Sequence, residues 1–200
     1  MTPNKQYERK TLAWPDVQML VEEIYRWAAK NIETKRTTLI HPIPLGGICP
    51  AVYFMYLWRN DDNRDGQNAR IVSNNDLLEM SNEQWSPPVA KVDKDTTLLV
   101  IDDIFDSGLT LKRVYTDLFG LFASKLVSET PRYCNAATLF YRQETPPLWG
   151  MLPTFSAAVV REKLWVVFPW EPEASKYELM EFGKDFYVGE TRYDEIVVGQ

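Results

Sequence analysis

The residues best suited to chemistry lie in one short stretch, where three aspartates precede residues with hydroxyl groups and a glycine. Asp102 and Asp103 are adjacent, and the run Asp106-Ser107-Gly108-Leu109-Thr110 follows shortly after them. Glycine lets the backbone approach a bound anion closely, and Ser and Thr hydroxyls add hydrogen-bond donors without charge. Because carboxylates repel a bare phosphate, the mixture suits a ligand that also offers hydroxyl donors or a divalent cation. A phosphorylated sugar bound with Mg²⁺ offers both.

A short apolar run precedes these acids, and a helical pattern follows them. Leu98–Ile101 is typical of a strand buried on both faces. The residues that follow at helical spacing are Leu111, Val114, Tyr115, Leu118, Leu121 and Phe122. The start of a helix carries unpaired N–H groups and about half a positive charge, so it attracts anions. The order of strand, acids, small-residue turn and helix therefore predicts a phosphate site at the carboxyl end of a parallel sheet.

This stretch closely resembles the phosphoribosyl-diphosphate (PRPP) motif of the type I phosphoribosyltransferases. That motif has an apolar strand, two acids, two further residues and Asp-Thr-Gly-x-Thr, and Ser107 replaces the first Thr here. The resemblance implies that Asp102 and Asp103 hold the ribose hydroxyls and Mg²⁺, and that residues 106–110 bind the 5-phosphate. Asp106 matches the residue proposed in that family as general base at the purine N7. The alternative is an ordinary strand-to-helix turn with solvated or helix-capping acids.

A glycine pair, Gly46-Gly47, stands between a β-prone run at 37–42 and an expected helix at 52–58. Such a pair presents backbone N–H groups to an anion, although a plain turn is the alternative. The resembled family has a diphosphate-binding loop at this place, commonly basic-Gly-Gly in the purine enzymes. The resemblance therefore implies that Leu45, Gly46 and Gly47 bind diphosphate. Leu45 occupies the basic position, so one charge-assisted contact is missing.

A second informative segment is Trp165-Val166-Val167-Phe168-Pro169-Trp170-Glu171, which by itself is also compatible with core packing. It resembles the Trp-x-x-x-Pro-Trp-acid segment of bacterial and archaeal 6-oxopurine phosphoribosyltransferases. The resemblance implies a base-binding segment in which Trp165 stacks on the purine, the backbone at Val166 reads its exocyclic group, and Glu171 closes the motif. Arg142 replaces a family Lys that donates to the purine 6-oxygen. A surface arginine at a strand end is the alternative reading of Arg142.

The sequence predicts an α/β fold like that of the type I phosphoribosyltransferases, with a central, mainly parallel sheet flanked by helices. Residues 1–12 are expected to form a flexible arm, 13–171 the core and 172–200 a C-terminal extension. The resemblance adds a mobile flap at about 74–95, without the usual Tyr, and a small base-binding hood with strands at about 155–171. Further elements are expected as helices at 15–31 and 174–182 and as strands at 71–73 and 135–141.

Composition narrows the possible functions. A length of 200 residues suits one α/β domain with additions. A net charge of −6 and the lack of a basic run argue against nucleic-acid binding. Cys49 and Cys134 have no metal-like spacing and are expected to be buried free thiols in a reducing compartment. His41 is expected to be a structural or rim residue, with a general base as the alternative. No stretch resembles a membrane span or a signal peptide, so we expect a cytoplasmic protein.

The resemblance therefore predicts a purine phosphoribosyltransferase with Mg²⁺ as cofactor. It would transfer ribose 5-phosphate from PRPP to hypoxanthine, guanine or xanthine, release diphosphate and form a nucleoside monophosphate. The departures at Leu45 and in the flap leave a catalytically weak, regulatory protein that binds PRPP or a nucleotide as one alternative. A phosphoribosyltransferase for another base is a further alternative. Family habit implies a homodimer or homotetramer.

Overall fold

The computed structural model describes residues 7–33, 37–63, 69–73, 96–123, 133–142, 153–161 and 163–188. The predicted flap at 74–95 lies outside these residues. The strands are β1 (Glu8–Thr11), β2 (Thr38–Pro42), β3 (Ala69–Ile71), β4 (Thr97–Phe105), β5 (Tyr133–Arg142), β6 (Phe155–Val160), β7 (Leu164–Val167) and β8 (Phe186–Val188). The helices are α1 (Trp14–Asn31), α2 (Ile48–Arg59) and α4 (Leu109–Ala123), with a 3₁₀ turn at Ala174–Lys176.

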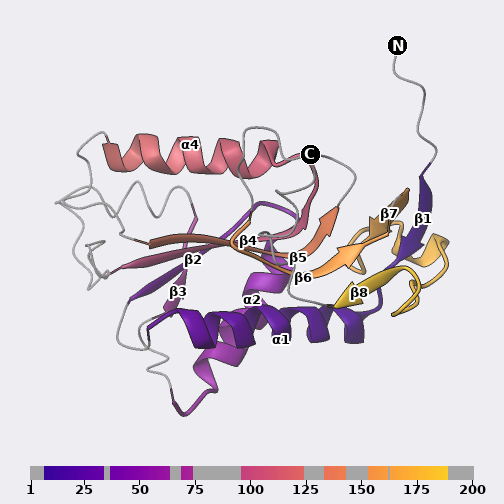
Figure 1. Cartoon of the computed structure of the whole chain (residues 1–200), viewed down its shortest axis with the longest axis horizontal. Helices are drawn as coiled ribbons and strands as arrows, with labels where there is room; N and C mark the ends of the chain where they lie inside the picture. The colour runs from indigo at the N-terminus through magenta and orange to yellow at the C-terminus, as the bar shows by residue number, and fades with distance from the viewer. Residues whose placement is uncertain are drawn as a thin grey trace, which may run out of the picture.

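Six strands form the central sheet, in the order β3-β2-β4-β5-β6-β8. Neighbouring strands from β3 to β6 are parallel, and β8 is added antiparallel at the edge. Helix α4 covers one face of the sheet, and α1 and α2 cover the other (Figure 1). The predicted mainly parallel α/β sheet is therefore confirmed. None of the helices that the structure describes is long and apolar enough to cross a membrane.

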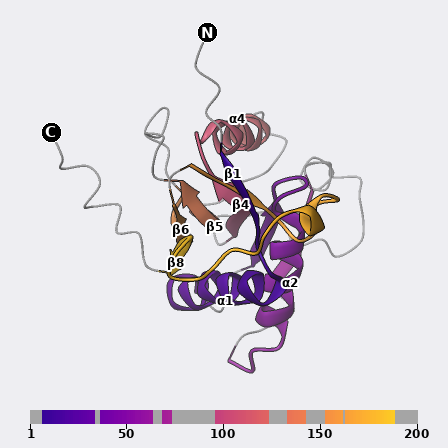
Figure 2. The same ribbon diagram turned by 90° about the vertical axis from the view of Figure 1, so that its right-hand side faces the viewer.

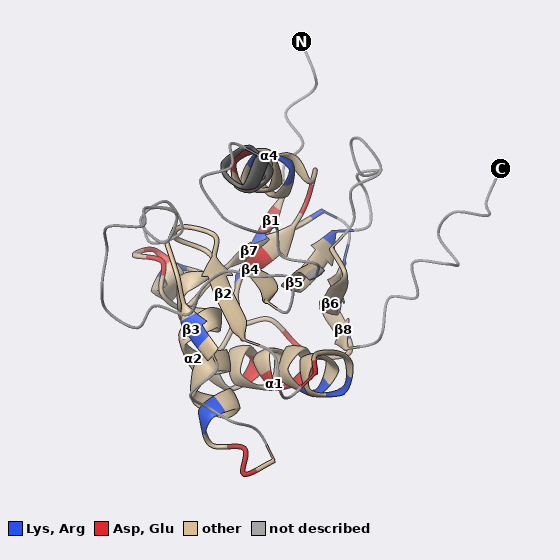
Figure 3. Ribbon diagram, turned by 90° about the vertical axis from the view of Figure 1, so that its left-hand side faces the viewer, with Lys and Arg blue, Asp and Glu red and all other residues tan. Residues whose placement is uncertain are grey.

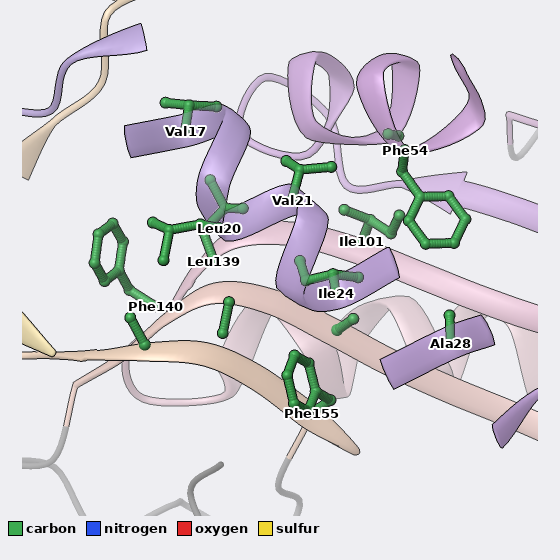
Figure 4. Close-up of a cluster of buried hydrophobic side chains, with 14 of the residues drawn as sticks. Val17, Leu20, Val21, Ile24, Ala28, Phe54, Ile101, Leu139, Phe140 and Phe155 are labelled. Carbon is green, nitrogen blue, oxygen red and sulfur yellow. The ribbon is translucent and has the colours of Figure 1, made fainter. Parts of the chain in front are cut away.

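The core lies on both faces of β4, because successive side chains of a strand point to opposite sides. Leu99 and Ile101 pack into the cluster under α1 and α2, whereas Leu98 and Val100 pack under α4. The buried residues of α1 recur at helical spacing and are Val17, Leu20, Val21, Ile24 and Ala28. Figure 4 shows them facing Phe140 and Phe155 of the sheet and Phe54 of α2. Burial of each large apolar side chain contributes about 1.5–3 kcal/mol.

Strand β4 is longer than predicted, because it continues through the two acids to Phe105. Asp102 is in register with Thr138 of β5, and Ile104 is in register with Phe140. The neighbouring strand thus extends the hydrogen-bonded ladder past the point where the apolar run ends. As a result, a rigid element rather than a loop holds Asp102 and Asp103.

The expectation of a flexible arm at residues 1–12 is wrong for residues 8–11. They form β1, which pairs in parallel with β7 in a separate two-stranded sheet, called the hood sheet below. Lys10 of β1 is buried against Asp185, with Nζ 3.0 Å from Oδ2, so the strand is also tied to the turn before β8. Residues 1–6 lie outside the part of the chain that is described.

Two other boundaries differ from those predicted. Strand β6, expected in the hood, belongs to the central sheet, so within 155–171 only β7 joins the hood sheet. The helix expected at 174–182 is only the 3₁₀ turn, because the backbone of 178–180 hydrogen-bonds to Thr11 instead. The part of the C-terminal extension that the structure describes, residues 172–188, is therefore integrated with both sheets, and Figure 2 shows it beside the N-terminal strand.

Candidate functional site

A cleft of about 350 Å³ opens at the carboxyl end of the central sheet. The end of β4, the loop before α4, the loop after β2 and residues of β5 line it. Among its lining residues are Asp102, Asp103, Asp106, Ser107, Gly108 and Thr110. The structure thus brings together all three aspartates and both hydroxyl residues that the sequence singled out. Figure 3 marks in red the acidic positions between β4 and α4.

The turn that starts α4 has the geometry expected of an anion loop. Gly108 has φ of 77°, a left-handed conformation that glycine adopts without steric cost. Its carbonyl accepts the Lys112 N–H at 2.9 Å, which closes the first helical turn. The side chain of Leu109 is 54% exposed, and its N–H donates to Ser107 Oγ at 3.4 Å. A 15-residue helix therefore begins directly at the cleft, and the start of a helix favours an anion.

The loop at Leu45, Gly46 and Gly47 packs tightly against β4. A Cβ on Gly46 would lie 2.5 Å from the Asp103 carboxyl carbon, and one on Gly47 would lie 2.0 Å from the Ile101 carbonyl oxygen. Gly47 therefore requires glycine, because the clash is with backbone, whereas a Cβ at Gly46 would have to displace the Asp103 carboxyl group. The Gly47 N–H donates to the Ile43 carbonyl at 2.9 Å, so this amide closes the turn rather than facing the cleft. Only Gly46 of the three residues lines the cleft.

Leu45 is the conformational exception in this loop. Its φ is 72° and its side chain is 84% exposed. A left-handed conformation costs a residue with a Cβ roughly 1–2 kcal/mol. Such strain in an exposed residue is typical of loops that bind a ligand. The side chain therefore points to solvent at the place where the resembled enzymes carry a basic residue.

The adjacent acids, Asp102 and Asp103, are held by the backbone of their own strand. The Asp103 N–H donates to Asp102 Oδ1 at 2.9 Å, and the Ile104 N–H donates to Asp103 Oδ1 at 2.6 Å. Burial, together with the neighbouring Asp103 charge, raises the pKa of Asp102 well above its usual range. Burial also raises the pKa of Asp103, and the charge of Glu171 adds to this effect. Negative charge is therefore costly here unless a ligand supplies a cation or hydroxyl donors.

The acid pair fits Mg²⁺ that is shared with a ligand. Mg²⁺ is commonly held by one or two carboxylates together with substrate phosphates and water. Across the described residues, no group of three or more His, Cys, Asp or Glu is arranged to hold a metal by itself. Asp102 and Asp103 would thus supply part of a coordination shell that substrate oxygens complete.

The predicted base-binding residues lie beside this cleft rather than in its lining. Trp165 of β7 is 43% exposed, so part of its ring is open to a ligand. Val166 is buried, and its backbone is in register with Lys10 of β1. Glu171 Oε1 accepts the Phe168 N–H at 3.1 Å and so stabilises the turn after β7.

Arg142 connects the two parts of the site. The interpretation of Arg142 as a surface residue is wrong, because its side chain is only 3% exposed. Its Nη1 donates to the Leu164 carbonyl at 2.5 Å, and its Nε lies 3.5 Å from Asp106 Oδ1. The guanidinium therefore stands between the hood sheet and the phosphate loop.

Sequence reasoning missed Tyr7 in the base-binding region. Its ring centroid is 6.1 Å from that of Trp165 and 5.3 Å from Arg142 Cζ. No local signal identifies this residue, because only the pairing of β1 with β7 brings it to the site.

The remaining candidates are structural. His41 is buried in β2, where its Nδ1 lies 3.1 Å from the Val72 carbonyl, and burial lowers the pKa of its ring. Cys49 and Cys134 are free thiols, as predicted, and both are partly buried. These three residues are not part of the cleft lining.

Comparison with solved structures gives the fold. The chain is similar to a purine phosphoribosyltransferase from Pyrococcus horikoshii, with a TM-score of 0.53 and 18% identity over 86% of this chain and 98% of that one. This chain has the phosphoribosyltransferase fold. A hypoxanthine-guanine-xanthine phosphoribosyltransferase matches with a TM-score of 0.50 and 13% identity over 82% of this chain and 80% of that one.

The chain is also similar in structure to a hypothetical protein from Neisseria gonorrhoeae with bound ppGpp. It matches with a TM-score of 0.55 and 17% identity over 85% of this chain and 93% of that one. No protein-family model matches the sequence, and no curated protein matches it. At these identities the likeness establishes the fold, and the site residues must carry the argument about function.

Proposed function

We propose that this protein transfers ribose 5-phosphate from PRPP to a 6-oxopurine. The observation that carries the proposal is the single cleft in which the acid pair, the loop at 106–110 and Gly46 meet. Each of these three parts suits one part of PRPP, namely the ribose hydroxyls, the 5-phosphate and the diphosphate. Trp165 lies beyond the cleft, joined to it through Arg142 and Asp106, where a base acceptor would be needed.

In this reaction the bond from ribose C1 to the diphosphate oxygen breaks, and a bond from C1 to purine N9 forms. Positive charge develops on the sugar, and negative charge develops on the departing diphosphate. Asp102 and Asp103 would accept hydrogen bonds from the ribose hydroxyls and hold Mg²⁺. That ion would neutralise part of the leaving-group charge. Gly46 would let the diphosphate approach the backbone of its loop closely.

Asp106 would take the proton that the purine loses. It lines the cleft, and its Oδ1 lies 3.5 Å from Arg142 Nε on the side of the hood sheet. A carboxylate between the ribose site and the base site is suited to proton transfer at N7, a contribution of about 10²–10⁴-fold. Trp165 would stack on the base. Stacking accepts any purine, so discrimination between purines must come from hydrogen bonds made by Arg142.

A regulatory protein that binds PRPP or a nucleotide is the second candidate. Leu45 favours it, because its exposed apolar side chain offers no charge to diphosphate. The Neisseria gonorrhoeae protein with bound ppGpp adds a structure of similar fold that holds a nucleotide. In this alternative the cleft would bind its ligand without turnover.

Diphosphate release from Mg-PRPP distinguishes the two candidates. The purified protein would be offered hypoxanthine, guanine, xanthine, adenine, uracil and orotate in turn. Release with the 6-oxopurines alone supports the transferase. Binding of PRPP or nucleotide without release for any base supports the regulatory protein, and release with uracil or orotate would identify another acceptor. The variant Leu45→Lys should be assayed in parallel, because a positive charge at this position should raise the rate of diphosphate release if the protein is a weak enzyme.

Light scattering of the same preparation tests the expected homodimer or homotetramer.

A further inference from the structure

Tyr7, Arg142 and Trp165 form a closed group of three side chains. The Arg142 Cζ lies 5.3 Å from the Tyr7 ring centroid and 6.0 Å from the Trp165 ring centroid. The two ring centroids are 6.1 Å apart, and their planes meet at 61°. An aromatic face attracts a guanidinium electrostatically. The two rings therefore form a corner in which the guanidinium is held.

The other contacts of Arg142 join the segment that contains Trp165 to the cleft at Asp106. Nη1 donates to Leu164, the residue directly before Trp165, and Nε lies near Asp106. Nε is buried and makes no hydrogen bond to any residue that the structure describes. A buried donor without an acceptor is unfavourable, so a small movement of Asp106 or a ligand oxygen would improve its environment. The corner thus holds a charged donor group beside both the proposed proton acceptor and the proposed stacking residue.

We propose that Tyr7 is a positioning residue that sets the preference of the base site. It acts through Arg142, by fixing the guanidinium against Trp165, and this role rests on the proposed function above. A fixed guanidinium donates and never accepts, so it pairs with an exocyclic oxygen and leaves an exocyclic amino group unpaired. A site with fixed polar groups rejects a mismatched ligand more strongly than a flexible one does. Tyr7 therefore favours hypoxanthine over adenine.

The pairing of the hood sheet explains why an N-terminal residue takes this role. Glu8 is in register with Leu164, and Arg9 is in register with Trp165. Tyr7 comes directly before this pairing, so β1 delivers its ring to the neighbourhood of β7. Tyr7 thus adds a third chain segment to a base site that β5 and β7 begin.

Calorimetric titration of the full chain tests the proposal. Hypoxanthine, adenine and Mg-PRPP would each be titrated into the unsubstituted protein and into the variants Tyr7→Leu and Tyr7→Phe. We expect Tyr7→Leu to weaken hypoxanthine binding about tenfold, since it removes one cation–π contact. Adenine and PRPP affinities should stay within about twofold, so the preference for hypoxanthine falls. Tyr7→Phe keeps the ring and should restore the preference. Tyr177→Leu is the matched control, because Tyr177 makes the same kind of contact with Arg9 in the same hood sheet.

Each outcome decides the matter. An unchanged hypoxanthine affinity in Tyr7→Leu overturns the proposal, and so does an equal loss for hypoxanthine and PRPP, which would mean general structural support. Failure of Tyr7→Phe to restore the preference would move the effect from the ring to the hydroxyl and overturn it as well. Guanine and xanthine are also titrated into the unsubstituted protein. If it binds PRPP but none of these three 6-oxopurines, the proposed function itself fails. A folding defect in Tyr7→Leu would appear as a lower melting temperature than that of Tyr177→Leu, and Tyr7→Phe then decides.

Discussion

The proposed phosphate end and the proposed base end of the site are built in different ways. At the phosphate end, the acids, the loop and the helix start all come from the continuous segment Thr97–Ala123. At the base end, Tyr7, Arg142 and Trp165 come from β1, β5 and β7 or their edges, far apart along the chain. Local geometry therefore fixes the phosphate end, whereas long-range pairing fixes the base end. This difference predicts that changes at the two ends will affect different measurable quantities.

The largest effect is expected for Asp106→Asn at the phosphate end. Loss of the proton acceptor should lower kcat by about 10²–10⁴-fold, while nucleotide affinity changes little. Diphosphate release and nucleotide titration measure the two quantities. Asp117→Asn is the control, because it makes the same change at an exposed position of α4 and should leave both unchanged. Loss of nucleotide binding in Asp106→Asn would instead make this residue structural and weaken the comparison.

At the base end, stability should depend on the buried pair of Lys10 and Asp185. Lys10 Nζ is 3.0 Å from Asp185 Oδ2, and the two side chains are 8% and 4% exposed. Lys10→Met would leave the buried carboxylate with its hydrogen bond from the Glu181 N–H but without its cation, at a cost of about 3 kcal/mol in the free energy of unfolding. The control Lys184→Met breaks an exposed pair with Glu181 and should cost less than about 0.5 kcal/mol. Similar urea midpoints for the two variants would show that the long-range pair does not hold the hood sheet.

The pair of Lys10 and Asp185 should also make the free energy of unfolding depend on pH. Burial alone would raise the pKa of Asp185, but the Glu181 N–H and Lys10 outweigh it and lower the pKa below its usual range. A lowered pKa in the folded protein means that the stabilisation is present above the unfolded value, which is about 3.9, and is lost as the pH falls through the folded pKa. The stability difference between the unsubstituted protein and Lys10→Met should therefore shrink below a pH of about 4.

Trp165→Ala tests whether the base end binds the base. Loss of stacking should weaken 6-oxopurine affinity by about 10- to 100-fold, from a contribution of about 1–3 kcal/mol, and leave PRPP affinity nearly unchanged. Trp14→Ala is the control, because Trp14 is also half-exposed and packs on another ring, that of Trp170. Equal weakening of purine and PRPP would assign Trp165 to packing instead, and the two ends would no longer be separable.

The smallest effect, and one of opposite sign, is expected for Asp102→Asn. The raised pKa of Asp102 means that the folded protein loses stability as the pH rises from the unfolded pKa through the folded one. An asparagine does not ionise, so the ligand-free variant should be more stable at pH 8 by about 1 kcal/mol, or about 3 °C in Tm. The gain should disappear toward pH 4. A lower Tm at pH 8 would show that the acid pair stabilises the fold rather than serving a ligand.

The same contrast explains what the sequence could predict. The central sheet and the cleft between β4 and α4 could be predicted from the sequence, because strand, acids, glycine and helix occur in immediate succession. The roles of Asp102, Asp103 and Asp106 stay predictions. The extension of β4 through Asp102 and Asp103 could not be predicted, because it depends on pairing with the neighbouring strand β5. Gly47 was predicted to offer its amide to an anion, yet the fold uses that amide to close the turn.

The hood sheet was the main failure, and its cause is physical. Glu8, Arg9 and Lys10 are charged residues that predict a solvated segment when read locally. Their strand exists because β7 supplies hydrogen bonds and Asp185 supplies a counter-charge for Lys10. Tyr7 could not be assigned to the base site for the same reason. A strand made of polar residues is recognisable only when its partner is known.

The pairing of β1 with β7 also has a consequence for synthesis on the ribosome. Strand β1 is translated before every other strand that the structure describes, but its partner β7 is completed only after β6. Until then β1 has an unpaired edge, a condition that exposes nascent chains to misassociation. The segment from β2 to β5 can meanwhile assemble the phosphate end. A stalled or truncated nascent chain would therefore carry the proposed phosphate site before the proposed base site is complete.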